Sequence, residues 1–240
     1  MKATRKEHDF LGELEIPNEV YYGVQTFRAI ENFNITGIPI SKEPLFIKAL
    51  GYVKKAAAMA NKDCGVLDAK IAEAICYGSD QLIAGKFDQE FVSDLIQGGA
   101  GTSVNMNANE VIANIGLEYL GHKKGEYQYL HPNNHVNCSQ STNDAYPSAF
   151  RIALYLKMES FLTTLEELEK AFTAKGREFS KVLKMGRTQL QDAVPMTLGQ
   201  EFHAYATTIG EDIKRLKEAQ SLVLEINMGA TAIGTKVNAP

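Results

Sequence analysis

The fold class follows from residues 144–183, which read DAYPSAFRIALYLKMESFLTTLEELEKAFTAKGREFSKVL and contain no proline after Pro147. Apolar side chains recur there at alternating steps of four and three residues, at Leu154, Met158, Phe161, Leu165, Leu168 and Phe172. This spacing predicts one long helix with an apolar stripe for side-by-side helix packing. Pro147 fits the first turn of such a helix, where a missing N–H is tolerated.

A second long helix is predicted from about Met196 onward. Its apolar stripe comprises Leu198, Phe202, Tyr205, Ile209, Ile213, Leu216 and Val223. A helix of about 30 residues spans roughly 45 Å, which is longer than a compact domain of this size is wide. Since a helical bundle usually needs four helices to enclose a core, we expect these two to form part of a larger bundle, completed by further sequence or by other subunits.

The preceding residues predict shorter elements. The first forty residues indicate irregular structure with one or two strands. Pro44 can open a helix, and Asp68 can cap a second one. A third helix should begin after the glycines at 98–101 and end near Gly121. The sequence therefore predicts a mainly α protein.

Composition restricts the function. The chain has 240 residues, 26.4 kDa and a net charge of −4, which provides no basic surface for nucleic acid or an anionic membrane. No apolar run approaches 18 residues, and the start, MKATRKEHDF, lacks the apolar segment of a secretory signal. The three cysteines form no C-x-x-C pair and are typical of reduced thiols, so we expect a cytoplasmic protein.

The first of three polar segments is GGAGTSVNMNAN at residues 98–109. Glycines allow close backbone approach to a ligand, and a helix start offers free N–H groups to an anion. Asparagine costs up to about 0.7 kcal/mol in a helix relative to alanine, so three of them within two turns suggest a role besides stability. An ordinary capped helix start remains the alternative.

The second polar segment is HPNNHVNCSQSTND at residues 131–144. Its last four residues are all good helix caps, yet a helix needs only one. The surplus hydroxyl and amide groups at a positive helix end suit a carboxylate or phosphate, and a solvated capped loop is the alternative. His131 and His135 have helical metal-ligand spacing, but Pro132 disfavours a helix there, so we expect no metal site.

The third polar segment, GRTQLQDAVP at residues 186–195, is predicted to be a loop that joins the two long helices. Arg187 could pair with a ligand carboxylate. An arginine near a helix end more often bonds the last carbonyl groups of that helix, and we favour that interpretation.

These segments resemble signature regions of the aspartase/fumarase superfamily. The resemblance extends from about Leu11 to Pro240 and rests on residues 98–107, 140–144 and 186–193, with residues 21–33 similar to the family's amino-terminal segment. Ala100 and Thr142 follow the aspartase pattern, where fumarases usually have serine. Gln189 replaces a histidine found in fumarases and many aspartases, and glutamine cannot act as a base.

The resemblance implies six substrate-binding residues: Thr102, Ser141, Thr142, Asn143, Thr188 and Gln189. Thr102 and Asn143, helped by Gln189, would lie near the α-amino group. The three remaining hydroxyls would bind carboxylates. The family's general base is a serine on a Gly-Ser-Ser loop; this chain has no Gly-Ser-Ser, so no catalytic residue is assigned, the base is expected beyond Pro240, and the chain alone should be inactive.

The resemblance also implies a fold and a reaction. The expected fold is a small mixed amino-terminal domain (1–142) followed by the first part of a central helical bundle (143–240). The expected reaction is release of ammonia from L-aspartate to give fumarate, which feeds the tricarboxylic acid cycle. A homotetramer with shared active sites is expected, with no cofactor and a divalent metal such as Mg²⁺ only as an activator. Alternatives are a fumarate hydratase, a lyase for another C4 amino acid, or a truncated non-catalytic subunit or interaction protein.

Overall fold

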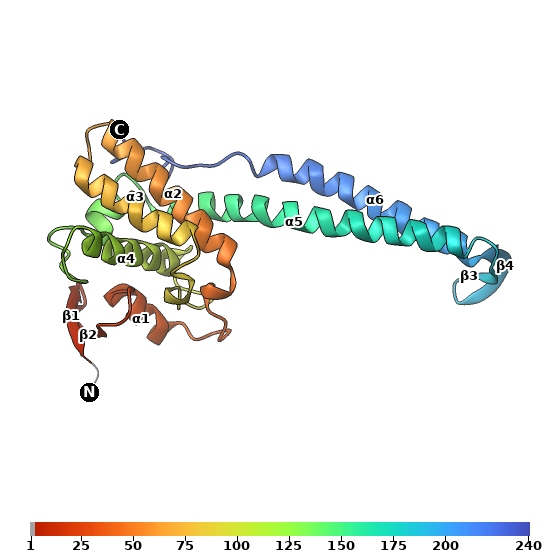
Figure 1. Ribbon diagram of the computed structural model, residues 1–240, viewed down its shortest axis with the longest axis horizontal. Coiled ribbons are helices and arrows are strands. Elements are labelled where there is room, and N and C mark those ends of the chain that lie inside the picture. The colour runs from red at the N-terminus through yellow and green to blue at the C-terminus, as the bar shows by residue number, and fades with distance from the viewer. Residues whose placement is uncertain (1–2) are drawn as a thin grey trace. The chain divides into compact units, whose positions relative to one another are not determined.

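The computed structural model describes residues 3–240 and confirms a mainly α protein (Figure 1). The chain forms two compact units. The first runs to Ala153 and includes the returning segment Ile226–Pro240, and the second is Leu154–Glu225. The domain boundary between residues 142 and 143 stays a prediction. Within residues 3–240, no helix is long and apolar enough to cross a membrane.

The first unit begins with a β-hairpin, as the sequence indicates. Strand β1 (Thr4–Asp9) pairs antiparallel with β2 (Gly12–Pro17). Helix α1 (Val24–Asn32) follows, although no sequence pattern predicts it. Its N-cap, Gly23, has no side chain, so the capping groups come from distant residues: Glu7 accepts the Val24 N–H at 2.9 Å and Glu110 accepts the Gly23 N–H at 2.8 Å.

Three predicted helices make the core of the first unit. They are α2 (Pro44–Asp63), α3 (Ala69–Ile83) and α4 (Thr102–Tyr119). Asp68 caps α3 as expected, with its Oδ1 accepting the Lys70 and Ile71 N–H groups. Helix α4 is buried on nearly every side, so its polar side chains lie inside the protein. Short 3₁₀ turns at Ile40–Lys42 (η1) and Asp88–Glu90 (η2) and one π-turn at Pro132–Val136 (η3) connect these helices.

Helix α5 (Thr142–Glu178) is the longest element of the chain (Figure 1). It starts two residues earlier than the stretch that predicts it, so Pro147 lies in its second turn and the expectation of a first-turn proline is wrong. Because proline has no N–H, the carbonyl of Asn143 loses its helical donor. The Asn227 side chain supplies a replacement hydrogen bond at 3.0 Å.

The second unit contains the rest of α5 and helix α6 (Leu198–Leu222), packed antiparallel. Lys217 pairs with Glu166 at 2.8 Å, and the ring of Phe172 contacts those of Phe202 and Tyr205. Thr197 and Gln200 cap α6 reciprocally. Only some members of the predicted apolar stripes are buried; Phe161 and Leu168 are exposed.

The connection between α5 and α6 is a β-hairpin, and the predicted loop is wrong. Strand β3 (Leu183–Thr188) pairs antiparallel with β4 (Gln191–Thr197), and α5 ends at Glu178 instead of near Leu183. Gln189 and Leu190 form the turn with φ of +48° and +65°. Such positive angles suit the right-handed twist of a two-residue hairpin, but Asn and Gly are the residues that normally signal them.

Candidate functional site

The first polar segment forms the start of α4. Gly101 has a φ of +94°, and any side chain there would collide with the ring of Tyr146. Gly101 provides no side-chain cap; Gln97 Oε1 accepts the Val104 N–H at 2.7 Å, and Thr102 is exposed at the first helical position. The glycines are therefore required by the backbone and by packing, while the helix start keeps polar groups near the surface.

The asparagines of this segment point into the protein. Asn107 Nδ2 donates to the Glu90 carbonyl at 3.0 Å, whereas Asn105 and Asn109 reach the second polar segment. Asn105 Nδ2 donates to Thr142 Oγ1 at 3.0 Å and to Asn137 Oδ1 at 3.2 Å. Asn109 Nδ2 donates to the same Asn137 oxygen at 3.3 Å. Their polar groups therefore tie two segments together, which explains residues that are costly for helix stability.

The histidines of the second segment serve the backbone. His131 Nδ1 accepts the N–H groups of Asn133 and Asn134, and His135 Nδ1 accepts the His131 N–H. Burial lowers the pKa of both histidines. No group of three or more His, Cys, Asp or Glu side chains in residues 3–240 is arranged to hold a metal ion.

Ser141 is the residue that caps α5. Its Oγ accepts the Asn143 N–H at 3.2 Å, and its own N–H donates to Asp144 Oδ1 at 2.9 Å. This reciprocal arrangement resembles a capping box with aspartate as the third helical residue. Thr142 and Asn143 are not used as caps. Thr142 Oγ1 accepts the bond from Asn105, which leaves its O–H free to donate at the positive end of a long helix.

The fully buried Asp144 carboxylate also fixes the returning segment of the chain. Its Oδ2 accepts the N–H groups of Gly229 and Thr231 at 3.2 and 2.8 Å. Asn143 adds a bond from its Nδ2 to the Ala232 carbonyl at 2.8 Å. The start of α5 and residues 229–232 are thus held as neighbouring walls.

A cavity of about 530 Å³ lies between these walls. It is lined by Asn137, Gln140, Ser141 and Thr142 on one side and by Thr231, Ala232, Ile233, Thr235, Val237 and Asn238 on the other. None of these side chains is charged. Hydroxyl and amide groups at a helix start can bind a small carboxylate, so we take this cavity as the candidate site.

The structure brings together only part of the predicted set. Ser141 and Thr142 line the cavity, and Asn143 bonds to a residue of its wall. Thr102 lies at the start of α4 and does not line it. Thr188 and Gln189 belong to the second unit, at the β3–β4 turn, where their side chains are exposed. Their shared role in binding stays a prediction.

Arg187, in the same hairpin, pairs with Asp192 across the two strands. Its Nε lies 3.2 Å from Asp192 Oδ1, and both side chains are about 70% exposed. The favoured interpretation, that this arginine bonds the end of a helix, is therefore wrong because no helix end is there.

Sequence reasoning missed one buried cation behind the cavity. Lys54 in α2 is fully buried, and its Nζ donates to Asn137 Oδ1 and Gln140 Oε1, both at 2.9 Å. Burial lowers the pKa of Lys54 to about 7, against the opposing influence of Asp144. The available signal is its position on the apolar face of α2, between Leu50 and Ala58.

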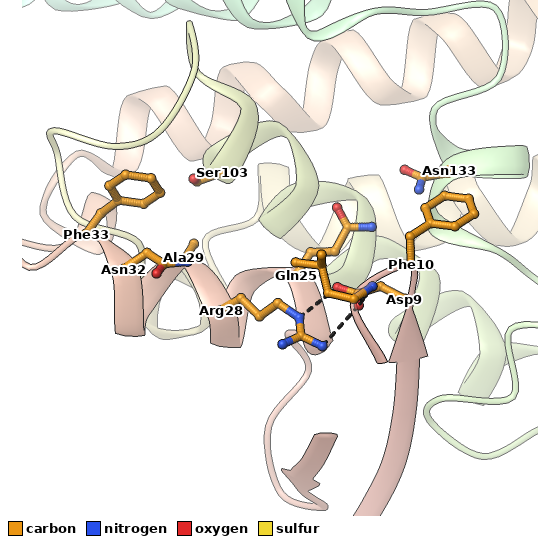
Figure 2. Close-up of a pocket in the computed structure, with 10 residues that line it drawn as sticks. Asp9, Phe10, Gln25, Arg28, Ala29, Asn32, Phe33, Ser103 and Asn133 are labelled. Carbon is orange, nitrogen blue, oxygen red and sulfur yellow. Dashed lines mark hydrogen bonds and ion pairs between the residues drawn. The ribbon is translucent and has the colours of Figure 1, made fainter. Parts of the chain in front are cut away.

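A second cavity, of about 370 Å³, lies beside the first hairpin (Figure 2). Arg28 of α1 is held there by two bonds to Asp9, at 2.9 and 3.0 Å. Ser103 and Asn133 contribute polar groups from the first two polar segments. Because Asp9 already offsets the charge of Arg28, this cavity is less suited to an anionic ligand than its arginine alone suggests.

Comparisons with known proteins agree with this architecture. A family model described as lyase matches residues 12–240. Proteins named aspartate ammonia-lyase from Pseudomonas fluorescens and Escherichia coli (strain K12) are 61% and 54% identical to this chain over 99% and 98% of its length. Each alignment covers 50% of the relative, so the chain spans about half the length of the curated relatives it matches.

Solved structures show the same fold. A fumarate lyase:delta crystallin from Brucella melitensis, bound to cobalt, matches with a TM-score of 0.95 and 54% identity, covering 99% of this chain and 52% of that chain. A recombinant class II fumarase from Schistosoma mansoni matches with a TM-score of 0.89 and 34% identity, covering 99% of this chain and 50% of that one.

Proposed function

The chain belongs to the lyase family, and from this premise we propose that it supplies substrate-binding elements of an aspartate ammonia-lyase, which converts L-aspartate to fumarate and ammonia. The observation that carries the proposal is the cavity at the start of α5, where Ser141 and Thr142 present hydroxyl groups beside amide side chains. Relatives that bear this name at 54–61% identity support it.

The proposed chemistry suits a site made of neutral donors. Removal of a proton from Cβ of L-aspartate leaves an enediolate dianion on the β-carboxylate; the carbon–nitrogen bond then breaks, ammonia leaves and fumarate forms. Fixed N–H and O–H donors stabilise that developing charge, and each contributes on the order of 3 kcal/mol in comparable oxyanion sites. The helix start of α5 adds a favourable dipole.

The roles of the residues remain part of the proposal. Ser141, Thr142 and Thr188 would bind the carboxylates, and Thr102, Asn143 and Gln189 would face the amino group. A serine outside these 240 residues would remove the proton. No cofactor is proposed, and Mg²⁺ would act only as an activator.

The same proposal includes a homotetramer in the cytoplasm, with active sites shared between subunits. The support for a homotetramer is the exposed apolar side chains of α5 and α6. The partners would be L-aspartate and fumarate, and neither nucleic acid nor a membrane.

A paired assay tests the function. Fumarate and ammonia are measured with L-aspartate, and fumarate with L-malate, using the 240 residues alone and the longest product of the reading frame that encodes them. We expect aspartate-dependent fumarate from the longer product only. Turnover of L-malate instead would assign a fumarate hydratase, and turnover of neither would favour a non-catalytic subunit. Activity of the 240 residues alone would refute the role given to an external serine.

A site variant links the activity to the cavity. Thr142→Val keeps the shape of the side chain and removes its hydroxyl, so we expect kcat/KM for L-aspartate to fall about 100-fold. Thr142→Ser retains the hydroxyl and should retain most activity. Thr163→Val, at an exposed position of the same helix, controls for the loss of a threonine.

A further inference from the structure

Lys54 is a buried lysine whose hydrogen-bond acceptors are two neutral side chains. It is 0% exposed, and its ammonium donates at 2.9 Å to Asn137 Oδ1 and at 2.9 Å to Gln140 Oε1. Burying a charge without an ion-pair partner in contact is costly, and a methionine of similar length would avoid the cost. Core packing alone does not explain a lysine at this position.

Both acceptors of Lys54 line the candidate cavity. Asn137 Oδ1 receives three donors, from Lys54, Asn105 and Asn109. Gln140 Nε2 in turn donates to the carbonyls of Val136 and Cys138 at 2.9 and 3.1 Å. The lysine therefore holds the two amide side chains that shape one wall, in a loop with little regular secondary structure.

Lys54 is also a source of positive charge close to a cavity with an uncharged lining. The cavity lining described above has no charged side chain, so a dianion would find only neutral donors there. Asp144 is the charged group that acts on Lys54 in the described structure, and it faces the lysine from the start of α5. The polar groups of α4 that share the Asn137 oxygen with Lys54, on Asn105 and Asn109, are neutral.

We propose that Lys54 is a positioning residue of this cavity, which fixes Asn137 and Gln140 in the wall and provides, from behind that wall, the positive charge for a C4 dicarboxylate. The identity of the ligand rests on the proposed function. The positioning of Asn137 and Gln140 by Lys54 does not depend on it. Binding of the dianion favours the charged form of Lys54, so ligand and proton binding are coupled.

The test uses Lys54→Met in the longest product of the reading frame, with Lys55→Met as the matched control. Lys55 is the next residue of α2, partly exposed and paired with Asp80 at 2.7 Å. Hydrogen–deuterium exchange of residues 136–142 is compared first, because it requires no turnover. We expect residues 136–142 to exchange faster in Lys54→Met than in wild type. In Lys55→Met, we expect their exchange rate to be unchanged. Equal exchange in both variants would overturn the positioning role whether or not the protein is a lyase.

Kinetics with L-aspartate test whether Lys54 provides positive charge to the bound ligand. We expect KM to rise about tenfold in Lys54→Met and less than twofold in Lys55→Met, in line with typical coupling between sites. The pKa of Lys54, about 7 without ligand, predicts that the wild-type KM rises with pH through the neutral range. Lys54→Met should lose this rise of KM with pH, whereas a variant with a purely structural defect would retain it. An unchanged KM and pH profile would overturn the proposal.

A further variant and a further ligand separate failure of this proposal from failure of the protein to fold or to act as a lyase. Lys54→Arg retains the positive charge and hydrogen-bond donors, so KM should stay low but no longer rise with pH, because a guanidinium remains protonated through the neutral range. If Lys54→Met does not fold, this variant and the wild-type pH profile decide. If wild type turns over no L-aspartate, the proposed function fails, and succinate titrations across the same pH range replace kinetics. Succinate affinity that falls with rising pH would then support the inference, and pH-independent affinity or no binding would overturn it.

Discussion

At the scale of single residues, Glu110 holds the beginning of α1 from inside the protein. Its carboxylate is 1% exposed and accepts hydrogen bonds from the N–H groups of Gly23, Gln25 and Thr26 and from the Thr26 hydroxyl, at 2.6 to 3.1 Å. Burial nevertheless raises the pKa of Glu110 to about 7, and the nearby carboxylate of Glu7 adds to the increase. The group therefore changes charge in the neutral range.

The direction of the pH effect follows from this shift. A carboxyl group with a raised pKa binds its proton more tightly in the folded state than in the unfolded state. Its contribution to stability is complete below the ordinary pKa of about 4.5 and is lost as pH rises to about 7. We expect the free energy of unfolding to fall by about 3 kcal/mol from this group between pH 4.5 and 8.

Urea unfolding at several pH values, in wild type and Glu110→Gln, measures this effect. The variant should lose most of the pH dependence and about 2 kcal/mol of stability at low pH, because a glutamine NH₂ faces backbone N–H donors. Glu31→Gln, on the exposed face of α1, is the control. Parallel pH profiles for wild type and Glu110→Gln would contradict the assignment.

Single residues also show how far the sequence predicts the candidate site. The surplus of polar groups before α5 indicates an anion site, and the structure places Ser141 and Thr142 at a cavity. Lys54 and Glu110 are not predicted, because a charged residue is normally assigned to the surface unless its partners are known. Those partners lie more than 80 residues away along the chain and meet only in the fold.

At the scale of secondary structure, local signals predict α2, α3 and α4 well, since proline, aspartate and glycine mark their ends. Helix α1 is missed because its capping groups belong to β1 and α4. The β3–β4 hairpin is missed because its turn lacks the Asn-Gly signal: Gln189 and Leu190 adopt positive φ without being typical for it.

This turn leads to a stability prediction. Leu190 is 99% exposed with φ of +65°, so Leu190→Gly removes backbone strain and little buried surface. We expect the variant to be more stable by about 1 kcal/mol. Leu183→Gly is the matched comparison: Leu183 is 80% exposed but lies in β3, where glycine should destabilise. Thermal unfolding distinguishes them, and a destabilised Leu190→Gly would refute the strain.

At the scale of the whole molecule, the two long helices expose apolar side chains that they cannot cover themselves. A groove of about 760 Å³ in the second unit is lined by Leu154, Met158, Phe161, Leu216 and Val223, among others. Phe161 is 51% exposed, and Leu168, seven residues further along the same stripe, is 39% exposed. Exposed apolar patches of this kind favour association between chains.

We therefore expect the 240 residues expressed alone to self-associate. Light scattering over a range of concentrations should show oligomers or aggregates, and the double variant Phe161→Glu/Leu168→Glu should shift the population toward monomer because buried carboxylates oppose association. Thr163→Glu adds a charge on the same helix, about half a turn away from Phe161, and should have little effect. The apolar stripe is responsible only if the two variants differ; a monomeric wild-type chain with a cooperative thermal transition would show that the two helices need no further cover.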